Sequence, residues 1–180
     1  MNRLKKIVAG TGGSEIAEAA LVLPILFMLL LGIYWFGRAF NVYATINHAA
    51  REGARLGTAS TCATCGANPN TQPTPDQIAG QVKQALQASR LDPAQVKHLL
   101  GITRARCGGG PPVSCSVPAA DPDICVYYNV QLNSLPPNSG APACGLSVEF
   151  QYPYQFFFPF TSLNMQKIML NAGVQMTGEY

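Results

Sequence analysis

Residues 19–37 read AALVLPILFMLLLGIYWFG, and residues 38–57 continue as RAFNVYATINHAAREGARLG. The first stretch contains no charged residue, and Glu18 and Arg38 bracket it. Nineteen residues in an α-helix span about 28 Å, which is close to the roughly 30 Å hydrocarbon core of a bilayer. The run Ala19–Gly37 therefore predicts a transmembrane helix, which divides the rest of the chain into a part before it and a part after it.

The apolar run does not have the form of a cleaved secretory signal. Such signals have apolar regions of about 7–15 residues followed by a small-x-small cleavage site, and neither condition is met here. Tyr34 and Trp35 stand near the far end, where interfacial aromatic residues are common. Pro24 removes one helical hydrogen bond, and two interpretations stay open: a passive kink, or a soft point that lets the helix loosen inside a packed filament.

The helical pattern continues beyond the apolar run. Apolar or small residues recur at spacings of three and four, at Phe36, Phe40, Tyr43, Ile46, Ala50 and Ala54. Polar residues recur in the same way on the other side, with His48 among them. This is the pattern of an amphipathic helix. We expect one helix from Ile16 to Leu56 whose outer half needs a folded domain or neighbouring helices to cover its apolar stripe.

Composition limits the classes of function. The chain has 180 residues, 12% of them charged, and a net charge of +3. Soluble domains have about 25% charged residues, so the deficit indicates a membrane or an assembly. A small and dispersed positive charge argues against nucleic acid as a partner. No phosphate-binding loop, Ser-His-Asp set or pair of acids is readable, and we expect no enzyme activity, cofactor or metal.

All six cysteines follow the apolar run, at Cys62, Cys65, Cys107, Cys115, Cys125 and Cys144. An even number confined to one side predicts disulfides in an oxidising compartment, and six cysteines allow 15 pairings. Cys62 and Cys65 form a C-x-x-C motif, which leaves a thiol oxidoreductase as an alternative. The motif leads into a proline-rich loop instead of opening a helix after a strand, so structural disulfides are preferred. A zinc site that uses Cys107 or Cys115 competes poorly with them.

Basic residues and cysteines together predict the orientation of the helix. Arg3, Lys5 and Lys6 precede the apolar run and favour a cytoplasmic N-terminus. Arg38 and later arginines weaken that inference, but the cysteines support it. Residues after about 38 are therefore expected outside the cytoplasm.

The outer part reads as a helix followed by strands. Thr74, Pro75 and Gln77 form a capping box with proline in the first helical position, before a buried stripe at Ile78, Val82 and Leu86. Asp92 and Pro93 can begin a further short helical turn, or this part of the chain leads into a strand near Ile102 to Cys107. Alternation predicts an antiparallel sheet of about three or four strands. One face of each strand carries Val126, Tyr128, Val130 and Leu132, the stretch near 146–156, or Ile168, Leu170, Ala172, Val174 and Met176. His98 is expected to be exposed. The fold class is α+β, a long helix packed on a small antiparallel sheet.

The chain has, in this order, a short basic leader, the motif SEIAEAALVLP, a membrane helix, FGRAF and AAREGARLG, and the order is specific over about residues 10–57. This order resembles the TadE-like family of minor pilins, or pseudopilins, of the tight-adherence (Flp) branch of type IV pilus systems. The tail LNAGVQMTGE resembles the final strand of such proteins. The resemblance implies a pilin-like fold and a leader removed by a prepilin peptidase on the cytoplasmic side of the membrane.

That peptidase cuts after a glycine and expects glutamate at the fifth mature position. Counting from Gly13 makes Ser14 the new N-terminus and places Glu18 fifth, whereas a cut after Gly12 would place it sixth. A carboxylate at the lipid boundary is costly unless it is paired. Its candidate partner is the freed ammonium group of Ser14 on a neighbouring subunit, and the alternative is the headgroup layer or the helix N-terminus. Neither interpretation assigns a role to Glu15.

The resemblance implies three segments: a leader at 1–13, a transmembrane and amphipathic helix at 14–57, and an extracytoplasmic α+β domain with disulfides at 58–180. The expected partners are the prepilin peptidase, other pilin or pseudopilin subunits, the pilus assembly platform and the lipid bilayer. The expected location is the cytoplasmic membrane, crossed once, with incorporation into a pilus as a further possibility. The alternatives are a permanent membrane anchor whose outer domain binds a partner, or the thiol oxidoreductase.

Overall fold

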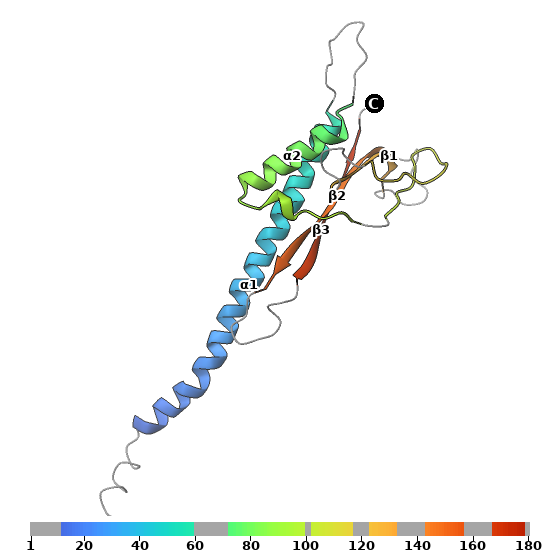
Figure 1. Cartoon of the computed structure of the whole chain (residues 1–180). Helices are drawn as coiled ribbons and strands as arrows, with labels where there is room; N and C mark the ends of the chain where they lie inside the picture. Colours follow the sequence, from blue (N-terminus) through green and yellow to red (C-terminus); the bar gives the residue numbers. More distant parts are fainter. Residues whose placement is uncertain are drawn as a thin grey trace, which may run out of the picture. The chain divides into compact units, whose positions relative to one another are not determined.

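The computed structural model describes residues 12–59, 72–99, 102–116, 123–132, 143–156 and 167–178. It contains two compact units, Met1–Phe40 and Asn41–Tyr180. Helices α1 (Gly12–Thr58) and α2 (Pro75–Ala88) precede a three-stranded sheet of β1 (Cys125–Gln131), β2 (Cys144–Gln155) and β3 (Lys167–Thr177). This order confirms the α+β class, with a long N-terminal helix and a small antiparallel sheet (Figure 1).

Helix α1 continues through Pro24 and through the change from apolar to amphipathic sequence. In the second unit its buried side consists of small and branched residues, Val42, Ile46, Ala49, Ala50 and Ala54. The predicted stripe was therefore correct from Ile46 onward. At its beginning, Phe36, Phe40 and Tyr43 are 59%, 70% and 48% exposed, which leaves this part of the stripe available to neighbouring helices.

Small residues on α1 allow α2 to approach closely. A Cβ atom added to Gly53 would lie 2.5 Å from Val82 Cγ2, and one added to Gly57 would lie 2.9 Å from Ile78 Cδ1. The buried stripe of α2 is formed by Ile78, Ala79, Val82 and Leu86, as the sequence pattern predicts. Large side chains on α2 thus fill the space that the two glycines of α1 leave open.

The beginnings of the short helices follow the sequence signals. The Thr74 hydroxyl accepts the Gln77 backbone N–H, and the Gln77 side chain accepts the Thr74 N–H at 2.9 Å, which completes the capping box. The short helix η1 (Pro93–Gln95) begins after Asp92, whose carboxylate accepts the Ala94 N–H at 3.0 Å. Both predicted helix starts are confirmed.

Strand β2 lies between β1 and β3, and both neighbours run antiparallel to it. Leu146 faces the end of α1, since a Cβ atom on Gly57 would lie 2.8 Å from its Cδ1 atom. Alternation places Val148, Phe150 and Tyr152 on the same face. The register pairs this row with Met176, Val174, Ala172 and Leu170 of β3, so the predicted single face of β3 is confirmed.

The single apolar face predicted for β1 was wrong. Val126 is opposite Val148, but Val130 is opposite Gly145, so β1 has one more residue than β2 between these pairs. Asn129, in this interval, has a φ of +54°. A β-bulge of this kind moves the following residues to the other face of the sheet. Val130 and Leu132 consequently join Cys125 and Tyr127 in one buried cluster.

Pro153 lies on β2 at a position where no backbone N–H is needed on the side of the strand that faces β1. Gln151 exchanges two backbone hydrogen bonds of 2.8 Å with Lys97, in line with β1. Since backbone groups alternate between edges, the nitrogen of Pro153 faces the same side as that of Gln151, beyond the end of β1. Proline in a strand is tolerated at such places, as its position in the sequence predicts.

The segment 102–116 covers β1 from its outer edge. Arg106 and Ser116 form single antiparallel bridges to Val130 and Val126. Gly108, Gly109 and Gly110 all have positive φ angles, which glycine adopts without a steric penalty, and they turn the segment back on itself. This part of the chain therefore places two cysteines, Cys107 and Cys115, next to the sheet.

Candidate membrane and assembly helix

The apolar part of α1 presents its large side chains to the outside of the unit. Most large hydrophobic residues between Ile16 and Phe40 are more than half exposed, for example Leu21 at 70%, Met28 at 75% and Ile33 at 70%. Among the described residues, α1 alone is long and apolar enough to cross a membrane. Apolar surface of this extent is stable in lipid or against other helices and unstable in water.

Aromatic and basic side chains meet at the end of the uncharged run. The Tyr34 and Trp35 rings make an edge-to-face contact with centroids 5.3 Å apart. The guanidinium carbon of Arg38 lies 5.7 Å from the centroid of the Trp35 ring, within the range of a cation–π contact. An amphipathic ring next to a cation is typical of the membrane–water interface. This geometry supports a membrane boundary near Gly37.

The residues of the expected processing site lie in the first turns of α1. The backbone of Gly13 and Ser14 is helical, and the Glu18 side chain is exposed. Positions 14 and 18 are one helical turn apart and share a face. The structure therefore places the expected new N-terminus and the carboxylate on one side of the helix.

Two glycines of the apolar helix are not required by packing among the described residues. A Cβ atom added to Gly32 or Gly37 would meet none of their side chains within 4 Å. The glycines of the buried stripe, Gly53 and Gly57, are in contrast tightly enclosed. Small residues on an exposed apolar helix permit close approach of another helix in a membrane.

The structure contains the disulfides Cys107–Cys144 and Cys115–Cys125, with Cα atoms 5.5 Å and 5.2 Å apart. The first joins the segment 102–116 to the start of β2, and the second joins it to the start of β1. Sequence spacing could not choose these pairs among the possible ones. Cys62 and Cys65 lie outside the described residues.

The prediction that His98 is exposed was wrong. Its side chain is half-buried, and its Nδ1 atom lies 3.2 Å from Cys125 Sγ. Ligand atoms of His98, Cys115 and Cys125 all lie within 4.8 Å of one another. Because the two sulfur atoms are bonded to each other, they are not available as thiolate metal ligands in this state. His48, by comparison, is exposed as predicted, 3.8 Å from the Glu52 carboxylate.

An ion pair beside the sheet has no signal in the sequence. Arg104 donates from Nε to Glu149 Oε1 at 2.8 Å, and Ser147 Oγ donates to the same oxygen at 2.7 Å. The Glu149 side chain is 2% exposed, and its Oε2 atom has no hydrogen-bond partner among the described residues. Burial and the Glu149 carboxylate raise the pKa of Tyr127, and Arg104 partly offsets this. The contacts of Glu149 with Arg104 and Ser147 connect the segment 102–116 to β2.

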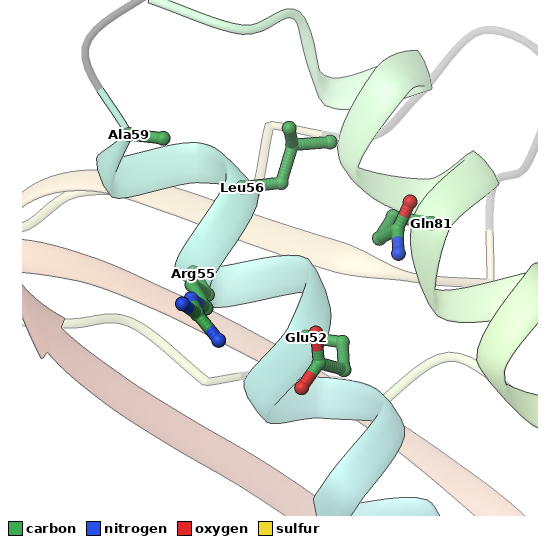
Figure 2. Close-up of a pocket in the computed structure, with 5 residues that line it drawn as sticks. All are labelled: Glu52, Arg55, Leu56, Ala59 and Gln81. Carbon is green, nitrogen blue, oxygen red and sulfur yellow. The ribbon is translucent and has the colours of Figure 1, made fainter.

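A pocket lies between the end of α1 and α2 (Figure 2). Its lining combines one acid, one base, one amide and two apolar side chains, from Glu52, Arg55, Leu56, Ala59 and Gln81. The lining contains no nucleophile and no cluster of metal ligands. The pocket thus gives no support for an active site, and the apolar helix is the feature that points to function.

Comparison with known protein families gives one match. Residues 13–55 match the family model described as TadE-like protein. Comparisons with curated proteins and with solved structures give no match. The TadE-like family is associated with the tight-adherence pilus and is structural in character, so the match supports a pilus-associated protein with pilus-related and membrane partners. Residues 13–55 are therefore similar to the TadE-like family, and the match agrees with the family resemblance that the N-terminal motifs indicated.

Proposed function

We propose that the chain is a minor pilin or pseudopilin of a tight-adherence pilus or of its assembly machinery. One observation carries the proposal: the segment that matches the TadE-like model includes an apolar helix whose large side chains are exposed from Ile16 to Phe40. Such a helix is suited first to a bilayer and then to a bundle of similar helices.

In this proposal a prepilin peptidase removes residues 1–13, and Ser14 becomes the new N-terminus. Residues 14–57 then form the membrane and assembly helix, and residues 58–180 complete the extracytoplasmic domain. The N-terminus is cytoplasmic before cleavage, which agrees with the basic leader and with disulfides on the other side of the helix. The lipid bilayer, the assembly platform and other subunits are the partners.

Glu18 has a defined role in the assembled helices. Its carboxylate is one helical turn from the position of the new ammonium group. In lipid an isolated carboxylate is costly, and an ammonium group from a neighbouring Ser14 would neutralise it. Pairing between neighbouring subunits would therefore fix the stagger of one helix relative to the next.

N-terminal sequencing of the membrane-inserted protein tests the proposal. In cells with a functional prepilin peptidase the mature chain should begin at Ser14, and in cells without the peptidase it should keep the leader. Gly12→Ala provides a matched control that keeps Gly13 and should still be cut. Gly13→Ala should block the cut. A chain that keeps Met1 in the presence of an active peptidase would contradict the proposal and favour a permanent membrane anchor.

A further inference from the structure

The disulfide Cys115–Cys125 has an imidazole against one of its sulfur atoms. His98 Nδ1 lies 3.2 Å from Cys125 Sγ, and Nε2 lies 3.8 Å from the same atom. Cys125 is completely buried, whereas Cys115 and His98 are half-buried. The two sulfurs therefore differ both in access from outside and in their polar surroundings.

Backbone contacts hold the histidine and both cysteines in place. The His98 N–H donates to Asp123 Oδ1 at 3.1 Å, and the preceding Lys97 is paired with Gln151 of β2. Ser116, next to Cys115, is paired with Val126, next to Cys125. The contact between imidazole and sulfur thus results from paired backbone on both sides of the disulfide.

The chain has two histidines, and the second lies elsewhere. His48 is on α1, beside Glu52. His98, the histidine that does not belong to α1, therefore lies next to Cys125. Cys107–Cys144, which joins the same segment to the sheet, offers an internal reference in the same molecule.

We propose that His98 is a general acid–base group for thiol–disulfide exchange at Cys115–Cys125, with external thiols and disulfides as the co-reactants. Exchange needs a thiolate to attack, and it is faster when the leaving sulfur is stabilised as a thiolate. An imidazole beside a cysteine supplies both conditions, since it accepts the proton of the attacking thiol and returns one to the leaving thiolate. The proposal does not depend on the pilin assignment.

The reductive direction takes two external thiols. The first attacks as a thiolate at the more accessible Cys115 Sγ, forms a mixed disulfide with it, and breaks the bond to Cys125. Cys125 leaves as a thiolate and takes a proton from the His98 imidazolium. A second external thiolate then attacks the external sulfur, which releases the Cys115 thiolate and an external disulfide. Two electrons have passed to the protein.

Disulfide formation is the reverse sequence, and it is the direction that an oxidising compartment favours. An external disulfide first reacts with the Cys115 thiolate and releases one external thiol. His98 then removes the proton of the Cys125 thiol, and the Cys125 thiolate attacks Cys115 Sγ. The second external thiol leaves. His98 would in this way speed closure of the bond during folding.

The test uses the full chain in detergent micelles and follows both disulfides separately. Reduced glutathione is added, free thiols are alkylated at intervals, and peptide mass mapping gives the rate for each pair. His98→Gln should slow reduction of Cys115–Cys125 by about tenfold or more. The rate at Cys107–Cys144 should stay the same. His48→Gln is the matched control and should change neither rate.

Two further measurements separate proton transfer from a structural effect. Added imidazole should restore the rate in His98→Ala, which a purely structural role would not allow. A brief exposure to oxidised glutathione after full reduction should place the mixed disulfide on Cys115. An unchanged rate in His98→Gln, equal slowing at both disulfides, no rescue by imidazole, or a mixed disulfide found mainly on Cys125 would overturn the proposal.

Discussion

Arg104 and Glu149 form an ion pair in which Arg104 donates at 2.8 Å to a carboxylate that is almost fully buried. The pair connects the segment 102–116 to the central strand, and Ser147 donates a further hydrogen bond to the same oxygen. A buried carboxylate that loses its cation keeps its desolvation cost without compensation. The pair is therefore sensitive to removal of one partner.

Arg104→Met should lower the free energy of unfolding by about 3–5 kcal/mol, because it leaves the Glu149 charge buried and unpaired. Arg106→Met is the matched control in the same segment. Arg106 is exposed and its Nε donates to the Pro111 carbonyl at 3.3 Å, so its loss should cost within about 0.5 kcal/mol. Urea unfolding in detergent micelles measures both, and equal effects would show that the buried pair contributes nothing specific.

Alanine at two helical glycines should have opposite effects. Both substitutions gain up to about 1 kcal/mol of helix propensity. At Gly53 the new Cβ would lie 2.5 Å from Val82 Cγ2, and overpacking of this kind costs about 1–3 kcal/mol. At Gly80 it would meet no neighbouring side chain within 4 Å in the described part of the chain. Thermal unfolding should therefore show Gly80→Ala as stabilised and Gly53→Ala as destabilised, and a gain at both would contradict the close contact between the helices.

Two tyrosines should make the domain sensitive to alkaline pH. Burial is the main cause that raises the pKa of Tyr127 and of Tyr152 above 10.0. The folded state then holds these protons more tightly than the unfolded state, so their contribution to stability is present below pH 10 and is lost as the pH rises through the folded pKa. The free energy of unfolding should fall above about pH 10.

Tyr127→Phe should reduce that alkaline loss. At neutral pH the variant should be less stable by about 1 kcal/mol, because it lacks the 2.9 Å hydrogen bond from the Tyr127 hydroxyl to the Ile102 carbonyl. Urea titrations from pH 7 to 11, with both disulfides checked by alkylation, give the two curves. If the free energies of unfolding of the wild type and of Tyr127→Phe change in parallel over the whole pH range, Tyr127 is not a source of the pH dependence.

Glu18→Ala should leave membrane insertion intact and impair assembly. The substitution removes a charge from the edge of the apolar run, which favours insertion, but it also removes the proposed partner of the neighbouring Ser14 ammonium group. Resistance to carbonate extraction measures insertion, and electron microscopy of sheared filaments measures assembly. Glu15→Ala is the control and should assemble. Normal filaments from Glu18→Ala would remove the pairing from the mechanism.

The sequence predicted those elements whose signals are local. The capping box at Thr74 and Gln77, the turn at Asp92 and the face of β3 are set by residues within a few positions of one another, and the structure confirms them. The apolar run predicted α1 for the same reason. Hydrogen bonds and periodicity within one element need no knowledge of its neighbours.

The errors occurred where contacts over long sequence distances decide the outcome. Phe40 and Tyr43 belong to the predicted stripe and are exposed, whereas Val42 and Ala49, which the pattern did not single out, are buried in the domain. The close approach of α2 selects small residues on α1, and spacing alone does not reveal that approach. The bulge near Asn129 likewise reverses the face of Val130, because one extra residue shifts a period of two.

The sites beside the sheet also depended on such contacts. His98 lies 27 residues from Cys125, and Arg104 lies 45 residues from Glu149. Neither spacing belongs to a local motif, and a single histidine gave no reason to expect a sulfur beside it. Strand pairing brings Cys107 to Cys144 and Cys115 to Cys125, and the sequence offered no way to rank the possible pairings.

The contact between Gly57 and Leu146 has a consequence for the order of folding. Gly57 lies in the last turn of the long helix and is made early, whereas Leu146 belongs to the central strand and is made after most of the domain. Contacts between residues so far apart in the chain close large loops and form slowly. The end of α1 that contacts Leu146 is therefore synthesised early, and this side of it is covered only when the central strand arrives.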